Sequence, residues 1–233
     1  MKELQGKIVI FGFGSFGRHL YKHLKPSGKD VIVVVDKENY THELDDEQID
    51  IKKINIKQNE DILELGIDPK NDLVYCSMDK TAHNLFLVLS LKTLYRQINI
   101  IAISNSFENA RKLKYAGATS VIDLYEATSR RFVHMLTKPA VMKAVDEIIY
   151  KENDLKMAEI TLPKDSPIDK KYLSQLDFKA QGIVLIAIID TERGRELSFV
   201  DHSIDHKLDS GDTLVVVAQK ENLEKFKSFL ERK

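Results

Sequence analysis

A glycine-rich loop near the start of the chain contains the residues whose types and spacing point most directly to chemistry. Residues 12–17 read Gly-Phe-Gly-Ser-Phe-Gly, and Asp36 follows 19 residues after the last glycine. The backbone N–H groups of Ser15, Phe16 and Gly17 are expected to point at an anion, which the dipole of a following helix also favours. A carboxylate at this distance can accept hydrogen bonds from a ribose diol. The pattern therefore predicts a nucleotide site.

The elements that must position this loop are also visible. The apolar run at residues 8–11 predicts a buried strand, and residues 20–24 have the apolar spacing of a helix that stops at Pro26. The β-branched run at residues 31–35 predicts a second strand that delivers Asp36. Strand, glycine loop, helix, strand and acid in this order predict a Rossmann βαβ unit.

Each glycine of the loop has a separate expected task. Gly12 permits the tight turn out of the strand, Gly14 lets a phosphate approach the backbone, and Gly17 lets the helix pack closely on the strand. The alternative is a glycine turn inside an α/β fold that binds no nucleotide, because a fold does not by itself imply a function.

The pattern of alternating strands and helices continues up to about residue 124 and predicts a doubly wound parallel sheet. Further strands are expected at residues 51–56, 73–76, 98–103 and 120–122, and helices at 61–65, 81–94 and 108–115. The loops after such strands meet at one edge of the sheet, where a nucleotide binds.

The pattern then changes. Residues 125–137 and 140–151 form two consecutive helical segments around Pro139, each with an apolar stripe that needs a covering surface. From about residue 154, short strands, turns and a closing amphipathic helix at 221–230 predict a small α+β module. The expected domains are therefore a Rossmann-like domain (1–124), a helix–Pro–helix crossover (125–152) and a C-terminal subdomain (153–233).

Composition limits the classes of function. The 233 residues have a formal net charge of −1, so no strong positive field favours nucleic acid. The single cysteine, Cys76, lies in an apolar run and suits a buried thiol in a reducing compartment. No signal peptide and no apolar stretch of about 20 residues is visible, so we expect a soluble, cytoplasmic chain that reaches a membrane only through a partner or a further segment.

Taken together, these features resemble the RCK family, the regulators of potassium conductance. The resemblance rests on the glycine loop with Asp36, the segment Lys114-Tyr115-Ala116-Gly117-Ala118, the crossover around Pro139, and the C-terminal stretch Gly211-Asp212-Thr213-Leu214-Val215-Val216. Members of this family are cytosolic domains of prokaryotic potassium channels and of Trk/Ktr-type transporters.

The resemblance implies a ligand-sensing gating module without enzymatic activity. It would bind an adenine nucleotide, namely NAD(H), ATP, ADP or AMP, dimerise through the crossover helices, assemble into an octameric ring and act on a membrane pore. A gating domain of a potassium channel is the main expectation, and a free-standing regulatory subunit of a transporter is the alternative. The expected nucleotide-binding residues are Gly12, Phe13, Gly14, Ser15, Phe16, Gly17, Asp36, Lys37, Asn55, Ser77, Met78, Asp79 and Asn105.

The chain departs from the family at two places. Many members have a Gly-Asp pair after the third strand, where this chain has Ile54-Asn55; an asparagine can still accept a hydrogen bond from an adenine amino group. Calcium-gated members have carboxylates where this chain has Ser77, Ile103 and Asn105, so we expect no tight calcium site in this cleft.

Two other chemistries remain open as alternatives. An NAD-dependent oxidoreductase would need an acid or base near the nicotinamide, for which only His83 and Ser104 are candidates; His83 is more simply interpreted as a surface or packing residue. A divalent cation is the second alternative, on a cluster in the C-terminal module that is more simply interpreted as solvated loop residues. Its members are Asp201, His202, Asp205, His206 and Asp209.

Overall fold

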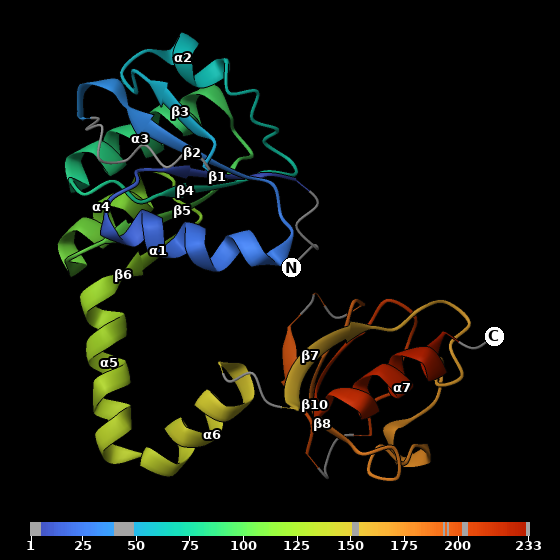
Figure 1. The fold of residues 1–233 in the computed structure, drawn as a ribbon. Helices are drawn as coiled ribbons and strands as arrows, with labels where there is room; N and C mark the ends of the chain where they lie inside the picture. Colours follow the sequence, from blue (N-terminus) through green and yellow to red (C-terminus); the bar gives the residue numbers. More distant parts are fainter. Residues whose placement is uncertain are drawn as a thin grey trace. The chain divides into compact units, whose positions relative to one another are not determined.

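The computed structural model describes residues 6–39, 49–150, 154–192, 194, 196–201 and 205–231. The chain divides into two compact units, and the division falls between Val133 and His134. Each unit has a β-sheet of its own (Figure 1).

The first unit contains a six-stranded sheet in the order β3-β2-β1-β4-β5-β6, and every neighbouring pair is parallel. This confirms the predicted Rossmann-like fold. The strand order reverses between β1 and β4, which creates a crevice beyond the carboxyl ends of these two strands. The strands are β1 (Ile8–Phe11), β2 (Val31–Asp36), β3 (Ile51–Ile54), β4 (Leu73–Cys76), β5 (Asn99–Ser104) and β6 (Ser120–Asp123).

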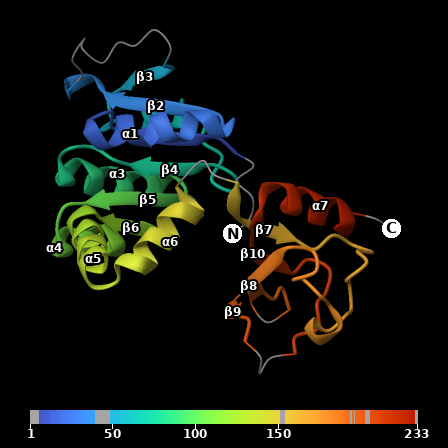
Figure 2. The same ribbon diagram turned by 60° about the horizontal axis from the view of Figure 1, so that its bottom comes forward.

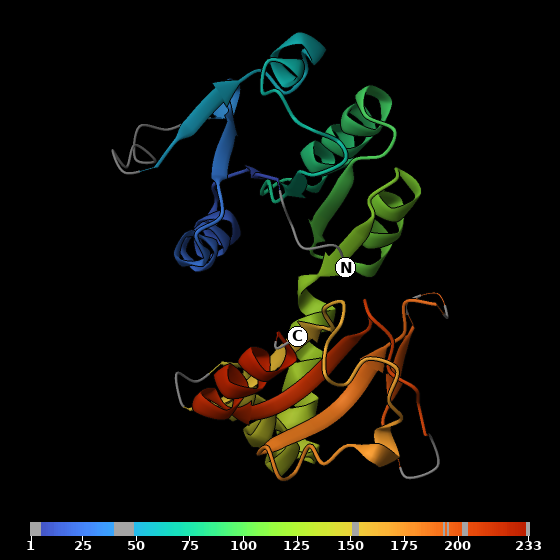
Figure 3. The ribbon, with the colours of Figure 1, turned by 90° about the vertical axis from the view of Figure 1, so that its right-hand side faces the viewer.

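Helices cover both faces of this sheet. The helices are α1 (Ser15–Leu24), α2 (Asn59–Leu63), α3 (Thr81–Leu94) and α4 (Phe107–Tyr115). In β1, Ile8 and Ile10 belong to a cluster with Tyr21 of α1, whereas Val9 and Phe11 belong to a cluster with side chains of α2, α3 and α4. Figure 3 shows α1 on one side of the sheet and α3 and α4 on the other. Because both faces are covered, β1 is apolar at every position.

The third strand is shorter than predicted. It ends at Ile54 and not at residue 56, because Asn55 begins a turn. The side-chain oxygen of Asn55 accepts a hydrogen bond from the backbone N–H of Lys57, and its backbone carbonyl oxygen accepts one from the backbone N–H of Gln58. An asparagine that bonds to nearby backbone in this way ends a strand.

Two helices follow the sheet, as the sequence predicted. Helix α5 (Leu124–Thr137) follows β6 directly, and the side chain of Asp123 accepts hydrogen bonds from the backbone of Tyr125 and Glu126 at its start. Helix α6 (Pro139–Ile149) has Pro139 in its first turn, where a missing N–H costs nothing. No helix in the described part of the chain is long and apolar enough to cross a membrane.

The second unit contains a four-stranded antiparallel sheet in the order β7-β10-β8-β9. Its strands are β7 (Leu155–Thr161), β8 (Ile183–Ile189), β9 (Leu197–Phe199) and β10 (Thr213–Gln219). Helix α7 (Lys220–Leu230) lies along β7 and β10 (Figure 2). Its Leu223, Phe226 and Leu230 are buried in the core of this unit. This confirms the small α+β subdomain.

Candidate functional site

The glycine-rich loop leaves β1 at the crevice. Its first glycine has no room for a side chain, and its second begins helix α1. Gly12 has a φ of 101°, a conformation that L side chains rarely adopt, and an added Cβ would lie 2.7 Å from Met78 Cα. Gly14 is the N-cap of α1 and provides no side-chain cap. The N–H groups in the first turn of α1 therefore have neither an intrahelical partner nor a capping side chain, which is the arrangement that binds an anion.

Ser77 fixes the loop from the neighbouring strand. Its hydroxyl is buried and lies 3.1 Å from the carbonyl oxygen of Phe11 and 3.2 Å from that of Gly12, and its backbone N–H donates to Phe11 at 2.8 Å. An added Cβ at Gly17 would overlap the carbonyl oxygen of Gly12. The first turn of α1 is therefore held against the end of β1, and the loop is preorganised.

A cleft of about 310 Å³ opens beside this loop. Six of the predicted site residues line it, together with four others. Its lining consists of Gly12, Phe13, Gly14, Arg18, Val35, Asp36, Met78, Asp79, Lys80 and His83. The cleft thus brings together the end of β1, the first turns of α1, the end of β2 and the loop between β4 and α3. This is the place where parallel α/β sheets bind their ligands.

Asp36 is the acidic residue of the pattern. It is the last residue of β2 and is 3% exposed, yet it lines the cleft. Its position beside the glycine loop is the one that places a carboxylate near a ribose diol. The glycine loop and Asp36, which the spacing in the sequence predicts to form one site, therefore line the same cleft.

Arg18 is the main residue of the cleft that the sequence pattern missed. Its Nε donates to the carbonyl oxygen of Phe13 at 3.1 Å, and its guanidinium carbon lies 5.7 Å from the centre of the Phe13 ring. The Phe13 ring itself packs edge-on against Tyr21, at 6.1 Å between ring centres. These contacts hold a cation at the mouth of the glycine loop. A basic residue directly after the last glycine was the available signal.

The other predicted residues lie at or near the same edge without lining the cleft. Lys37 Nζ lies 3.3 Å from Asp61 Oδ2, and the backbone N–H of Asn55 donates to the same carboxylate at 2.8 Å. The hydrogen bond from Asn55 holds the pKa of Asp61 below its ordinary value, with a smaller contribution from Lys37. Asn105 follows β5, where its side chain lies 3.4 Å from the hydroxyl of Thr81. Ser15, Phe16 and Gly17 form the first turn of α1.

Val35, Lys80 and His83 also line the cleft and were not predicted as site residues. His83 was interpreted as a surface or packing residue, whereas the structure places it beside the glycine loop. Lys80 is the N-cap of α3, and His83 lies in the first turn of that helix. Their proximity depends on how α3 starts over the crevice, which a local pattern does not contain.

Cys76 ends β4 and is fully buried in the core of the first unit. Burial away from water disfavours the thiolate and raises the pKa of Cys76 far above its ordinary value. A buried thiol of this kind is inert as a nucleophile, as the sequence suggested.

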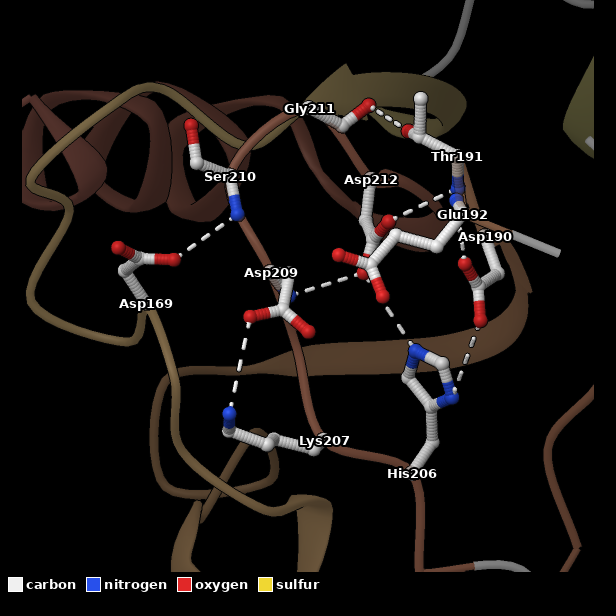
Figure 4. Close-up of polar contacts among 10 residues, drawn as sticks. All are labelled: Asp169, Asp190, Thr191, Glu192, His206, Lys207, Asp209, Ser210, Gly211 and Asp212. Atoms are coloured by element: carbon white, nitrogen blue, oxygen red, sulfur yellow. Dashed lines mark hydrogen bonds and ion pairs between the residues drawn. The ribbon is translucent and has the colours of Figure 1, made fainter.

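The polar cluster of the second unit is a structural network around Asp212 (Figure 4). Asp212 is 1% exposed, and its two carboxylate oxygens accept hydrogen bonds from the backbone of Thr191 at 3.0 Å and of Asp209 at 2.9 Å. His206 Nε2 lies 3.4 Å from Asp212 Oδ2, and its other ring nitrogen lies 4.0 Å from Asp190. Asp212 therefore connects the turn before β10 to the end of β8.

The residues proposed as an alternative cation site are used differently. Asp205 accepts hydrogen bonds from the backbone and the hydroxyl of Ser174, and Asp209 lies 3.9 Å from Lys207. His202 lies outside the described residues. Over the part of the chain that is described, no three histidine, cysteine or acidic residues are grouped as metal ligands.

We expect Asp212→Ala to lower the stability of the second unit by about 2 kcal/mol, because two part-buried backbone N–H groups lose their buried acceptor. For a unit of this size the melting temperature falls by roughly 4–8 °C per kcal/mol. The matched control is Asp209→Ala, which removes only a weak ion pair with Lys207 and should change stability by less than about 0.5 kcal/mol. Calorimetric melting of the full chain decides this, and equal shifts for the two variants would contradict the role of Asp212.

Comparison with known proteins agrees with these features. The TrkA-N domain model matches residues 8–124, and the TrkA-C domain model matches residues 157–231. Potassium channel protein 1 of Methanocaldococcus jannaschii is 22% identical over 233 residues, covering 99% of this chain and 68% of that protein. Probable potassium channel protein 2 of the same organism is 24% identical over 242 residues, covering 100% of this chain and 69% of that protein.

Solved structures show the same fold. The crystal structure of the GsuK RCK domain matches 97% of this chain with a TM-score of 0.50 and 18% identity. The structure of the GsuK channel bound to NAD matches 98% with a TM-score of 0.50 and 17% identity. The present chain spans 46% and 39% of those two chains. With a TrkA-N match over the Rossmann-like sheet and a TrkA-C match over the antiparallel module, the chain belongs to the TrkA-N/TrkA-C family of RCK-type domains.

Proposed function

We propose that this chain is a regulatory module that binds an adenine nucleotide in the cleft beside the glycine loop. The observation that carries the proposal is the convergence of four features on one cleft: an uncapped helix start, a glycine loop held by Ser77, the buried acid Asp36 and the basic residue Arg18. The first three form a dinucleotide-binding arrangement, and the fourth supplies a cation for phosphate. The structure of the GsuK channel, which shares the fold, has been solved bound to NAD.

The nucleotide is proposed to act as a signal and not as a reactant. An oxidoreductase needs a substrate pocket with its own acid and base beside the nicotinamide. The second unit instead closes around its own apolar core, with Asp212 and His206 engaged in a structural network. These features support a binding module better than a dehydrogenase.

The partner is proposed to be a potassium channel pore. The two Methanocaldococcus jannaschii relatives are named as potassium channel proteins, and this chain corresponds to about two thirds of each. We propose that α5 and α6 pair with the same helices of a second copy, and that dimers assemble into a ring that transmits ligand binding to the pore. The exposed apolar side chains of Phe132, Leu136 and Val141 support the first of these steps.

A thermal melting panel tests the nucleotide proposal. NAD, NADH, ATP, ADP and AMP are added separately to the full chain at millimolar concentration. A ligand at one hundred times its dissociation constant adds about 2.7 kcal/mol to the stability of the unit that binds it. At roughly 2–4 °C per kcal/mol for a chain of this size, we expect a rise of several degrees with at least one nucleotide.

Two variants show whether the rise comes from the cleft. Asp36→Ala removes the carboxylate at the end of β2 and should reduce the rise, whereas Asp30→Asn, at the residue just before that strand begins, should leave it unchanged. Absence of any rise with all five nucleotides would exclude the proposed function. A rise that is equal in wild type and Asp36→Ala would exclude this cleft as the site.

A further inference from the structure

Asp79 occupies a position in the cleft that the motif reserves for the ligand. An added Cβ on Gly14 would overlap the carboxylate oxygen Oδ1 of Asp79, so this side chain covers the bare face of the second glycine of the loop. In a glycine loop of this type, that face is where the backbone approaches a phosphate. The space made by the glycine is therefore filled by an anion of the protein itself.

The charges that line the cleft are of both signs. Arg18, Lys80 and His83 supply the cationic or titratable groups, and Asp36 and Asp79 supply the carboxylates. Asp79 is exposed and, among the described residues, has no hydrogen bond or ion pair. No described side chain forms an ion pair with it, so a phosphate at the loop encounters this carboxylate directly.

The two kinds of adenine nucleotide respond differently to such a charge. In a dinucleotide the pyrophosphate is esterified at both ends, so each of its two phosphates carries one negative charge. In AMP, ADP or ATP the terminal phosphate carries about 1.5–2 charges at neutral pH. A carboxylate next to one phosphate position of the binding loop therefore opposes a terminal phosphate more strongly than it opposes either phosphate of a dinucleotide.

We propose that Asp79 is a specificity determinant of this cleft, because its carboxylate over Gly14 disfavours a terminal phosphate and so favours a dinucleotide pyrophosphate. This rests on the proposed function and names its ligand class. The carboxylate swings away from Gly14 when the pyrophosphate enters, and Arg18, held by Phe13, supplies the opposing charge. Asp79 thus acts on the ratio of affinities among nucleotides, while the glycine loop and Asp36 supply the common part of binding.

Calorimetric titration of the full chain with NAD, AMP, ADP and ATP tests this, in a chelator so that no metal alters the phosphate charge. Wild type is compared with Asp79→Asn, which keeps the shape of the side chain and removes its charge. One unit charge at about 4 Å in water corresponds to roughly fivefold in affinity. We expect NAD to bind about fivefold more tightly to the variant, and AMP, ADP and ATP on the order of 10–25-fold more tightly. The gain should shrink at high salt.

Asp30→Asn is the matched control, because it removes the same charge just before β2 begins, away from the carboxyl end of that strand, and should change no affinity. Equal gains for all four nucleotides, unchanged affinities or weaker binding in Asp79→Asn would overturn the inference while leaving the proposed function intact. If neither wild type nor variant binds any of the four, the proposed function fails and the inference fails with it. If only the variant binds ADP and ATP, the inference is supported in its strongest form.

Discussion

Gly17→Ala is expected to unfold or severely destabilise the first unit, by about 3 kcal/mol or more. A Cβ at this position would overlap the carbonyl oxygen of Gly12 and would also lie 3.3 Å from the hydroxyl of Ser77. Neither neighbour can yield easily, since Ser77 fixes the backbone of Phe11 and Gly12. Overpacking against rigid backbone belongs to the short list of causes of large destabilisation.

Gly28→Ala is the informative control for this prediction. Gly28 has a φ of 70° but nothing within 4 Å of an added Cβ, so its substitution costs only the left-handed backbone conformation, about 1–2 kcal/mol. Denaturant unfolding of the full chain, followed through the first unit, compares the two variants. If Gly17→Ala costs no more than Gly28→Ala, then the close approach of α1 to β1 is not needed for the fold.

The same variant separates binding from folding. If Gly17→Ala still folds at low temperature, α1 must move away from β1, and the N–H groups of its first turn move with it. We then expect nucleotide-dependent stabilisation to be lost even in the folded fraction. The glycine is thus needed both for packing and for the orientation of the anion-binding N–H groups.

The glycine loop and its flanking elements could be predicted because their signals are local. A β-branched run, a glycine at a positive φ and an apolar helical spacing each depend on a few consecutive residues, and β1, α1 and β2 formed where expected. Asp36 could be placed as well, since its distance along the chain is set by one helix and one strand.

The composition of the cleft wall depends on contacts between distant segments, and it was predicted only in part. The sequence predicts Met78 and Asp79 as site residues because they follow a strand, but the contact of Asp79 with Gly14 joins segments that lie 65 residues apart in the sequence. Lys80 and His83 enter the cleft because α3 starts over the crevice. A pattern of residue types contains no information about that approach.

The second unit shows the same limit. The sequence predicts turns between short strands in this unit, whereas it does not predict the burial of Asp212. Its role depends on Thr191, which lies at the end of another strand. A buried carboxylate that joins two strand ends cannot be distinguished from a solvated turn residue without the pairing of β8 with β10.

Leu136→Asp is expected to convert a dimer of this chain into monomers. Leu136 is 69% exposed in the single chain, and Phe132, one turn earlier on the same face of α5, is 61% exposed. Val141, at 56%, and Val145 extend the apolar surface on α6, although Val145 is only partly exposed. Large apolar side chains of this kind each contribute about 1.5–3 kcal/mol when they become buried.

A two-fold interface contains each substituted position twice. Two copies of Leu136→Asp therefore lose about 3–6 kcal/mol of burial, which weakens dimerisation on the order of 10²–10⁴-fold, and two introduced carboxylates repel each other in addition. Sedimentation at micromolar concentration should show a dimer for wild type and a monomer for the variant.

Ala127→Asp is the matched control, because residue 127 is exposed on the opposite face of α5. The substitution introduces the same charged residue, with the same helix propensity, as Leu136→Asp. It should leave the dimer intact. A wild-type chain that sediments as a monomer at all accessible concentrations would remove the proposed pairing of crossover helices. If both variants dissociate the dimer equally, then charge on α5 and not the apolar face is responsible. If only Leu136→Asp dissociates it, the exposed apolar stripe on α5 is part of the dimer interface.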